Sequence, residues 1–183
     1  LKNLSMAIIA AKLCNLKEKK IFNSLKKIRD VNGRMELVKT FSNNIKVYVD
    51  FAHTPDALLK SLNALKNNYG KNISLVFGCG GDRDQKKRPL MAKIANKHCK
   101  KIYITDDNPR NENPKQIRND IKRNIIKSKL FEIPSRKNAI KKAIQDLKAG
   151  EVLLIAGKGH ENYQEYSKKK FFSNKKNILN NIK

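Results

Sequence analysis

Apolar and polar positions along this chain follow two different periods, and the alternation of these periods predicts alternating helices and strands. Residues 2–28 carry apolar residues at helical spacing in LSMAIIAAKLC and EKKIFNSLKKI, which predict two helices. A glycine turn in VNGRMELV then leads into an extended segment at 31–38, and polar residues at 42–44 form a break. From residue 45 onwards, short apolar runs alternate with longer stretches of helical spacing.

Each predicted strand runs directly into a polar or glycine-rich loop. The strands lie within IKVYVDFA (45–52), NISLVFGCGG (72–81), KIYITDDN (101–108) and EVLLIAGKGHE (151–161). Their cores, such as VYV, LVF and VLLIA, are almost continuously apolar, which is typical of strands covered on both faces. The weakly alternating YQEYSKKKFFS predicts an edge hairpin near the end of the chain.

The predicted helices between these strands carry recognisable start and stop signals. Thr54 can cap a helix in which Pro55 takes the first position and Gly70 the end. Ser135 can cap another helix, which runs to Leu147. Helices are also predicted for RPLMAKIANKHC (88–99), PKQIRNDIKRNII (114–126) and KKNILNNI (175–182).

Alternating strands and helices predict βαβ units, and therefore an α/β fold with a mostly parallel sheet and helices on both faces. Ligands of such sheets bind beyond the carboxyl ends of the strands. The segments DFAHTPD, GCGGDRD, TDDNPR and AGKGHE all follow strands, so they should meet at one rim. Loops of this kind are often polar. Even so, the recurrence of Arg, His, Asp and Glu in all four favours a binding site.

The strong positive charge of the chain has two interpretations. With 41 Lys and Arg against 16 Asp and Glu, the net charge is +25, which is typical of nucleic-acid-binding proteins. The alternative is a general bias toward Lys, Asn and Ile. We favour bias, because the lysines are spread over every predicted helix and no RNP, zinc-finger or KH signature is present. We therefore expect no nucleic-acid partner.

The cysteines and the apolar segments bear on the cellular compartment. Three cysteines without CxxC spacing argue against a disulfide framework or a structural zinc site, and they indicate a reducing cytoplasm. No run of about 18 apolar residues predicts a membrane span. The first residues resemble a signal peptide only superficially, because the apolar run is short and continues as an amphipathic helix.

Several chemical motifs are incomplete. GCGGDRD approaches the dinucleotide fingerprint GxGxxG, but Arg83 stands at the third glycine. There is no Walker A loop, no HExxH and no GxSxG. His53 and His160 follow strands without metal-ligand spacing, so we expect no metal site in this segment. Cys79 has no base positioned beside it, and we interpret it as a small buried residue.

The loop TDDNPR combines both signs of charge. Asp107 and Arg110 lie close together, with Pro109 stiffening the turn. They could pair with each other. They could instead bind a zwitterion, with Asp107 and Asn108 on its ammonium group and Arg110 on its carboxylate. The loop alone leaves both possibilities open.

The combination of motifs resembles one family. VNGRMELV, VDFAHTPDAL, FGCGGDRD followed by KRPLM, TDDNPR and AGKGHE occur in this order over residues 1–167. Together they resemble the C-terminal part of the Mur ligases, and most closely the members that add meso-2,6-diaminopimelate in peptidoglycan synthesis. This resemblance implies that 1–38 is a helical end of the central ATPase domain with its linker. It implies that 39–183 is the Rossmann-like C-terminal domain, which binds the amino acid.

The resemblance also implies an activity and a set of partners. Family members activate the carboxylate of UDP-N-acetylmuramoyl-dipeptide as an acyl phosphate, using ATP and Mg²⁺, and the amine of diaminopimelate attacks it. We expect the chain to be a fragment that lacks the P-loop, because no Walker A loop and no initial Met are present. Alone it should be inactive, with ATP and Mg²⁺ bound mainly by the missing domains. A cytoplasmic monomer without membrane contact is expected.

Site residues carry over from the family motif by motif. The resemblance assigns diaminopimelate binding to Arg83, Asp107, Asn108, Pro109, Arg110, Gly157 and Glu161. It assigns ATP contacts to Arg34, Asp50, His53 and Lys86. Lysine-adding relatives lack the arginine of DNPR, so Arg110 favours diaminopimelate. A lysine-adding ligase and, more remotely, a basic nucleic-acid module are the alternatives. The lysine-rich SKKKFFSNKKN departs from the family pattern and leaves the C-terminal edge in doubt.

Overall fold

The computed structural model describes residues 2–28, 31–70, 72–167 and 169–172. Its contacts divide the chain into two compact units, Leu1–Val31 and Asn32–Lys183. The last predicted helix, KKNILNNI, lies outside the described residues. The predicted domain boundary between residues 38 and 39 stays a prediction, although a strand of the second unit, β1 (Glu36–Thr40), spans it.

The first unit is a pair of helices, as the apolar spacing predicts. They are α1 (Lys2–Leu13) and α2 (Glu18–Leu25), and Lys12 of the first forms an ion pair with Glu18 of the second. Within α2 only Ile21 is buried, whereas Ile9, Leu13 and other large apolar side chains are exposed. Two helices of this length bury little apolar surface by themselves.

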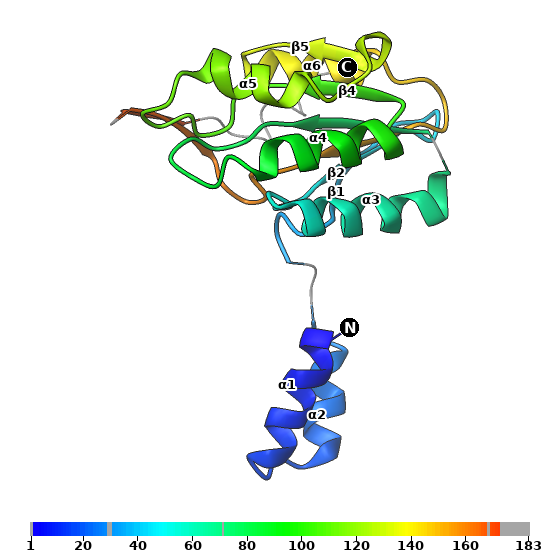
Figure 1. The fold of residues 1–183 in the computed structure, drawn as a ribbon. Helices are drawn as coiled ribbons and strands as arrows, with labels where there is room; N and C mark the ends of the chain where they lie inside the picture. The colour runs from blue at the N-terminus through cyan, green and yellow to red at the C-terminus, as the bar shows by residue number, and fades with distance from the viewer. Residues whose placement is uncertain (1, 29–30, 71, 168, 173–183) are drawn as a thin grey trace. The chain divides into compact units, whose positions relative to one another are not determined.

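The second unit is built on a six-stranded sheet with the order β1-β2-β6-β3-β4-β5 (Figure 1). Its strands after β1 are β2 (Lys46–Val49), β3 (Ile73–Phe77), β4 (Lys101–Ile104), β5 (Leu130–Glu132) and β6 (Val152–Ile155). β1 pairs antiparallel with β2, and the other neighbours are parallel. The predicted α/β class with a mostly parallel sheet is confirmed.

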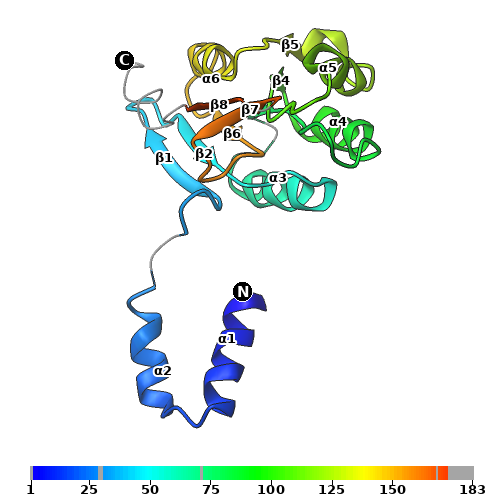
Figure 2. The ribbon, with the colours of Figure 1, turned by 90° about the vertical axis from the view of Figure 1, so that its left-hand side faces the viewer.

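Helices cover both faces of this sheet (Figure 2). One face packs against α3 (Pro55–Tyr69), α4 (Lys87–His98) and α5 (Pro114–Lys122), which contribute Leu58, Met91 and Ile121 to a continuous core. The other face packs against α6 (Arg136–Gln145), which contributes Ile140 to a second core. Burial of each such side chain stabilises the fold by about 1.5–3 kcal/mol.

The helix starts follow the predicted capping signals. Thr54 accepts a hydrogen bond from the Ala57 N–H at the start of α3, and Ser135 accepts one from the Asn138 N–H at the start of α6. The start of α5 uses a signal that the sequence analysis did not name, because the Asn113 side chain caps it ahead of Pro114. These caps place the helix N-termini beside the loops that follow the strands.

Two features differ from the sequence prediction. The strand β5 is only three residues long, follows a short 3₁₀ turn at Lys127–Lys129, and was not predicted. The C-terminal hairpin exists as β7 (Tyr163–Tyr166) and β8 (Lys169–Phe172), but it forms a separate two-stranded sheet instead of extending the main sheet. A single parallel bridge from Arg110 to Tyr166 links it to the loop after β4.

Candidate functional site

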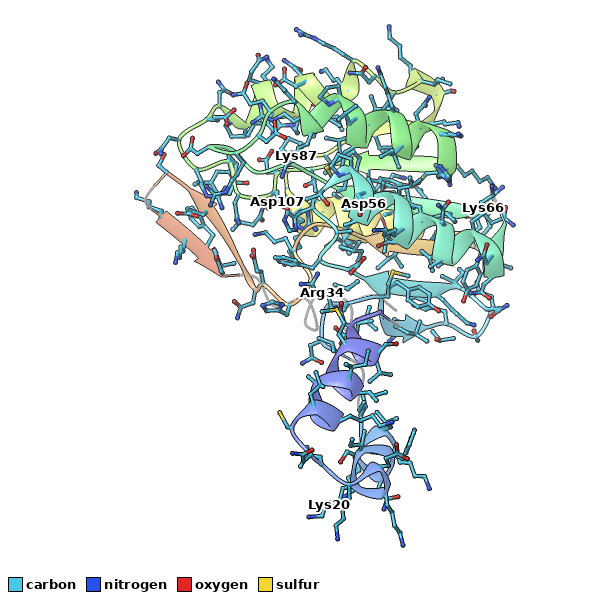
Figure 3. The ribbon with its side chains drawn as sticks, turned by 60° about the horizontal axis from the view of Figure 1, so that its bottom comes forward. Lys20, Arg34, Asp56, Lys66, Lys87 and Asp107 are labelled. Atoms are coloured by element: carbon cyan, nitrogen blue, oxygen red, sulfur yellow. The ribbon has the colours of Figure 1, made fainter. Side chains whose placement is uncertain are left out.

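A cavity of about 600 Å³ lies where the loops after β2, β3, β4 and β6 meet. This is the rim at which the sequence predicts a site. Figure 3 shows Arg34, Lys87 and Asp107 toward the end of the sheet where α3 begins, while Lys66 marks the opposite end of that helix. Of the predicted site residues, the cavity is lined by His53, Arg83, Asp107, Asn108, Arg110, Gly157 and Glu161.

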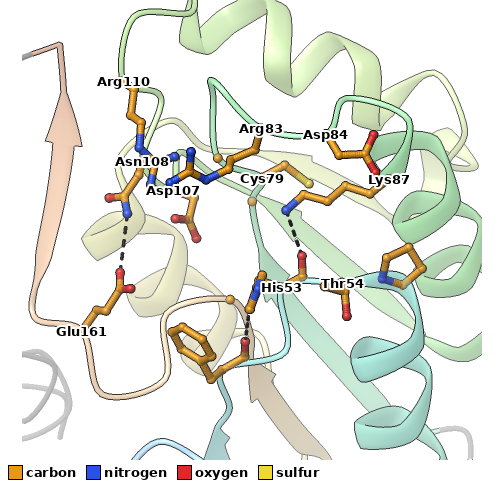
Figure 4. A pocket seen from close by; sticks show the side chains of 15 residues that line it. His53, Thr54, Cys79, Arg83, Asp84, Lys87, Asp107, Asn108, Arg110 and Glu161 are labelled. Carbon is orange, nitrogen blue, oxygen red and sulfur yellow. Dashed lines mark hydrogen bonds between the residues drawn. The ribbon is translucent and has the colours of Figure 1, made fainter.

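Four predicted residues do not line the cavity, and several lining residues were missed. Pro109, Arg34, Asp50 and Lys86 lie outside the lining, whereas Lys87, one residue further along, belongs to it. The Lys87 ammonium donates to the His53 carbonyl at 3.0 Å (Figure 4). The other lining residues that the sequence analysis did not assign are Phe51, Thr54, Pro55, Gly78, Cys79, Gly80 and Asp84.

Arg110 is held by two partners, and neither of them is Asp107. Its Nη1 donates to the Gly81 carbonyl at 2.7 Å, and its Nε lies 3.3 Å from a Glu165 carboxylate oxygen. Its backbone has a φ of 52°, a region that few non-glycine residues adopt. The self-paired alternative between Asp107 and Arg110 is therefore not the arrangement in this structure. The Arg110 side chain remains 21% exposed and borders the cavity.

Asp107 faces two buried cations instead. One of its carboxylate oxygens lies 3.6 Å from Lys158 Nζ, and the other lies 3.9 Å from Arg136 Nη1. Neither cation was named by the sequence analysis. Burial lowers the pKa of Arg136, and the Asp107 carboxylate acts in the opposite direction. Buried basic residues are rare, and the two beneath one carboxylate mark an unusual electrostatic environment.

Asn108 and Glu161 face each other across the cavity (Figure 4). Asn108 Nδ2 donates to a Glu161 oxygen at 3.5 Å, a long contact. Asn108 Oδ1 already accepts from the Lys158 ammonium at 2.6 Å and from the Glu165 N–H at 2.9 Å. Both acceptor positions of the amide are thus occupied, so the amide nitrogen is the group that Asn108 can offer to a ligand.

The C-terminal hairpin packs against the loop after β4. The sequence left this C-terminal edge in doubt. Gln164 Nε2 donates to the carbonyl of Asp107 at 2.9 Å and to that of Asp106 at 3.0 Å. The Tyr166 hydroxyl donates to the Asp106 carboxylate at 2.9 Å. Arg110 N–H donates to the Glu165 carbonyl at 3.1 Å. The hairpin thereby orders the backbone that carries the predicted amino-acid site.

The glycines of GCGG permit two loops to pack closely. A Cβ at Gly78 would lie 2.2 Å from the Thr105 carbonyl oxygen, and one at Gly81 would lie 1.9 Å from the Pro109 carbonyl oxygen. These positions need glycine for contact with the loop after β4. Cys79 between them is buried, and desolvation raises the pKa of its thiol to about 12. It is an unreactive core residue, as expected.

Three of the four predicted nucleotide contacts, Arg34, Asp50 and His53, gather around Phe51. The Arg34 guanidinium lies 4.6 Å from the centre of the Phe51 ring, and the His53 ring lies 4.8 Å from it. His160 stacks on the same ring at 5.8 Å. Asp50 is buried and accepts hydrogen bonds from the backbone N–H of Phe51 and Met35 and from the Ser61 hydroxyl. Its carboxylate therefore ties this corner of the fold together.

Metal-binding clusters and membrane-spanning helices are both absent from the described residues. No group of three or more His, Cys, Asp or Glu among them has an arrangement that could hold a metal ion. Within the same part of the chain, every helix is too short or too polar to cross a membrane. What the cavity does offer is both signs of charge on opposed loops, which suits an amino acid with more than one charged group.

Comparison with known proteins identifies similar chains. Residues 33–159 match the family model described as "Mur ligase, glutamate ligase domain". A UDP-N-acetylmuramoyl-L-alanyl-D-glutamate–2,6-diaminopimelate ligase of Rickettsia bellii is 51% identical over 147 residues, which cover 79% of this chain and 30% of that protein. The Rickettsia typhi ligase of the same name is 48% identical over 170 residues, covering 92% and 34%.

Solved structures agree with the sequence relatives. The structure of a ligase with the same name has a TM-score of 0.75 and 38% identity, and the match covers 95% of this chain and 36% of that one. A UDP-N-acetylmuramate-alanine ligase from Thermotoga maritima, at 19% identity and a TM-score of 0.63, shares the fold. This chain spans about a third of the length of the curated relatives that it matches.

Proposed function

The chain belongs to the Mur ligase family, and on that premise we propose that it is the amino-acid-binding part of a ligase that adds meso-2,6-diaminopimelate to UDP-N-acetylmuramoyl-L-alanyl-D-glutamate. The observation that carries this proposal is the Arg110 guanidinium, which Glu165 and the Gly81 carbonyl hold at the edge of a cavity that also contains Asp107 and Glu161. A guanidinium that is already held in place beside two carboxylates suits the distal end of diaminopimelate, where a carboxylate and an ammonium are attached to the same carbon.

The geometry suggests how the far end of diaminopimelate would bind. Arg110 has N–H groups left over after its contacts to Gly81 and Glu165, and these can donate to the distal carboxylate. Arg83 lines the same cavity and can approach the same group. Asp107 and Glu161 accept from the distal ammonium, and Pro109 and Gly157 shape the loops around it. An ammonium held by carboxylates stays protonated, so the amine at the other end is left to attack.

Specificity against lysine follows from the same contacts. Lysine has no distal carboxylate, so it would cover Arg110 without compensating its charge. A partly buried donor left unpaired in this way costs about 1–3 kcal/mol, which corresponds to roughly 5- to 150-fold in affinity. The arginine therefore disfavours lysine as well as attracting diaminopimelate.

We place nucleotide contacts on the other side of the cavity. Arg34 and His53 flank Phe51, and Lys87 extends toward the same loop, so two cations and an imidazole are available to the phosphates of ATP. Asp50 accepts hydrogen bonds from the backbone N–H groups of Met35 and Phe51 and so fixes the backbone beside Arg34. Lys86 is exposed at the start of α4. In the proposed reaction ATP transfers a phosphoryl group to the carboxylate of UDP-N-acetylmuramoyl-dipeptide, which gives the acyl phosphate and ADP. As the family resemblance implies, we expect Mg²⁺ to be held mainly by parts of the enzyme outside this chain. A cytoplasmic, monomeric enzyme is proposed.

Calorimetric titration of the chain with meso-diaminopimelate and with L-lysine tests the proposal. We expect diaminopimelate to bind and lysine to bind about 100-fold more weakly, as an unpaired arginine predicts. Equal affinities would identify a ligase for another amino acid. Binding of a nucleic acid that weakens steeply with salt, without binding of either amino acid, would instead favour the basic-module alternative.

A further inference from the structure

Lys158 is a deeply buried charged group next to the cavity, although it does not line it. Its side chain is 3% exposed. Its ammonium donates to Asn108 Oδ1 at 2.6 Å and to Glu161 Oε2 at 3.0 Å, and it lies 3.6 Å from Asp107 Oδ1. Two of the three residues that it joins, Asp107 and Glu161, form the proposed ammonium-binding side of the site, and Asn108 lies between them. They come from two loops that are far apart in the sequence.

The surroundings of Lys158 satisfy its charge without solvent. An isolated buried ammonium is strongly unfavourable, so it persists only where acceptors and counter-charges surround it. Here oxygens of Asn108 and Glu161 accept hydrogen bonds from the ammonium, and Asp107 adds a second negative charge. The centre of the Tyr163 ring lies 5.1 Å from Nζ. A lysine ammonium has three N–H donors, and oxygens of Asn108, Glu161 and Asp107 surround this one.

A second buried cation supports Asp107 from behind. Arg136 is 6% exposed, and its Nη2 donates to the Ala156 carbonyl at 2.7 Å. Its Nη1 lies 3.9 Å from Asp107 and, among the described residues, has no hydrogen-bond partner. Two buried cations thus face the two carboxylates Asp107 and Glu161. The internal charges balance before any ligand enters.

We propose that Lys158 is a positioning residue of the amino-acid site, whose buried ammonium holds Asp107, Asn108 and Glu161 together so that both carboxylates meet one ligand ammonium. This inference rests on the proposed function. Without the internal ammonium, Asp107 and Glu161 would repel each other. Glu161, which is 24% exposed, would then turn toward solvent, because like charges in a poorly solvated site separate.

Removal of Lys158 should change the affinity for the ligand ammonium in the direction opposite to that expected from charge alone. Removal of a cation beside two carboxylates should, by charge alone, strengthen the binding of another cation. If Lys158 positions the carboxylates, its removal weakens that binding instead, because the ligand ammonium meets only one of them. The two expectations differ in direction as well as in size, so one substitution separates them.

The experiment compares Lys158→Met with Lys93→Met, a substitution of an exposed lysine on α4. Two ligands are titrated by calorimetry: meso-diaminopimelate, and 2-aminopimelate, which lacks the distal ammonium. We expect Lys158→Met to weaken diaminopimelate binding roughly 20-fold, within the range for a lost charged hydrogen bond, and Lys93→Met to leave it unchanged. The difference between the two ligands should shrink by the same factor in Lys158→Met and stay unchanged in Lys93→Met.

A merely structural role for Lys158 would weaken both ligands by the same factor and preserve their difference, which would overturn the proposal. Diaminopimelate binding that is unchanged or tighter in Lys158→Met would overturn it too.

If the unsubstituted chain binds no diaminopimelate, the proposed function fails, and a ligand-free measurement still decides on Lys158. We then expect a slowly exchanging ammonium signal of Lys158 in ¹⁵N NMR. We also expect a shift of the Asn108 side-chain amide in Lys158→Met; absence of both would contradict the buried counter-ion.

Discussion

Two arginines in neighbouring strand-end loops were assigned the same kind of ligand, and the structure holds them very differently. Arg110, in the loop after β4, contacts Glu165 and the Gly81 carbonyl through two of its nitrogens, and its backbone is bonded to β7. Arg83, in the loop after β3, is exposed, and its recorded hydrogen bond goes to its own neighbour, the Asp82 carbonyl, at 3.1 Å. Both point toward the same part of the cavity (Figure 4).

The difference shows that residue type alone does not determine what an arginine contributes. A guanidinium that is already ordered loses little conformational freedom when a carboxylate arrives, so more of the contact energy appears as affinity and specificity. An exposed arginine must be ordered by the ligand, and solvent screens its charge. We therefore attribute the discrimination against lysine to Arg110, and a weaker, salt-dependent attraction to Arg83.

The largest expected effect comes from the contact that joins the two loops. Gly81→Ala would place a Cβ 1.9 Å from the Pro109 carbonyl oxygen, so the loops must separate and Arg110 loses its Gly81 partner. We expect the free energy of unfolding to fall by about 1–3 kcal/mol, as for other overpacked positions. Diaminopimelate binding should become undetectable by calorimetry.

Gly80→Ala is the matched control for that substitution. Its Cβ would come closest to the tip of the Arg110 side chain, at 3.0 Å, and a side-chain tip can move aside. The nearest backbone atom, the Asn108 carbonyl oxygen, would lie at an ordinary contact distance of 3.6 Å. Chemical denaturation of both variants measures the difference in stability. If both lose the same stability, the close approach of the two loops is not what requires glycine at position 81.

Removal of the ordered arginine should have the next largest effect. Arg110→Ala leaves Glu165 without its cation and the ligand without its carboxylate partner. We expect diaminopimelate to bind about 100-fold more weakly, because one charged contact of about 1.5–3 kcal/mol is lost. Lysine should bind more tightly than before, because no guanidinium is left unpaired beside it. Calorimetry with both ligands measures the two affinities, and Arg123→Ala, an exposed arginine after α5, serves as the control. Retained preference for diaminopimelate in Arg110→Ala would rule out the role given to Arg110.

Neutralisation of the internal partner of Arg110 should have a smaller effect of opposite sign. Glu165→Gln keeps an oxygen that can accept from Arg110 Nε but removes the competing negative charge. Diaminopimelate should then bind about threefold to fivefold more tightly, in line with a partly exposed ion pair. Weaker binding would show that the charge of Glu165 holds Arg110 in place and does not compete for it. Asp56→Asn, at the exposed start of α3, serves as the control. Glu112 is unsuitable as a control, because its carboxylate pairs with the buried Arg88.

The smallest effect is expected for the exposed arginine. Arg83→Ala should weaken diaminopimelate binding about threefold at low ionic strength, and the loss should shrink as salt is added, because exposed charges are screened. Titrations at two salt concentrations check this. A loss as large as that of Arg110→Ala, independent of salt, would mean that the ligand orders Arg83 into a second specific contact.

Much of the fold could be predicted from local patterns. Continuous apolar runs such as that of β6 indicate a strand covered on both sides, and Thr54 with Pro55 or Ser135 marks a helix start within a few residues. Because parallel strands end at one edge of a sheet, the four polar loops could be expected to share a rim. β5 was missed because three residues after a 3₁₀ turn carry too little periodicity.

The partners of the site residues could not be predicted, because they depend on tertiary contacts between distant segments. In AGKGHE, Lys158 reads as an ordinary loop lysine, and lysines are almost always exposed. Its burial depends on Asn108 and Asp107, which are brought to it by a different strand. The pairing of Arg110 with Glu165 depends on a hairpin whose sequence gives only weak alternation. The choice of Lys87 over Lys86 depends on the exact start of α4.

The most direct test is a crystal structure of the chain with meso-diaminopimelate bound. The account predicts the distal carboxylate on the terminal nitrogens of Arg110, which keeps its contact to the Gly81 carbonyl, and the distal ammonium between Asp107 and Glu161. A ligand whose distal carboxylate rests on Arg83, with Arg110 still engaged only by Glu165 and Gly81, would contradict it.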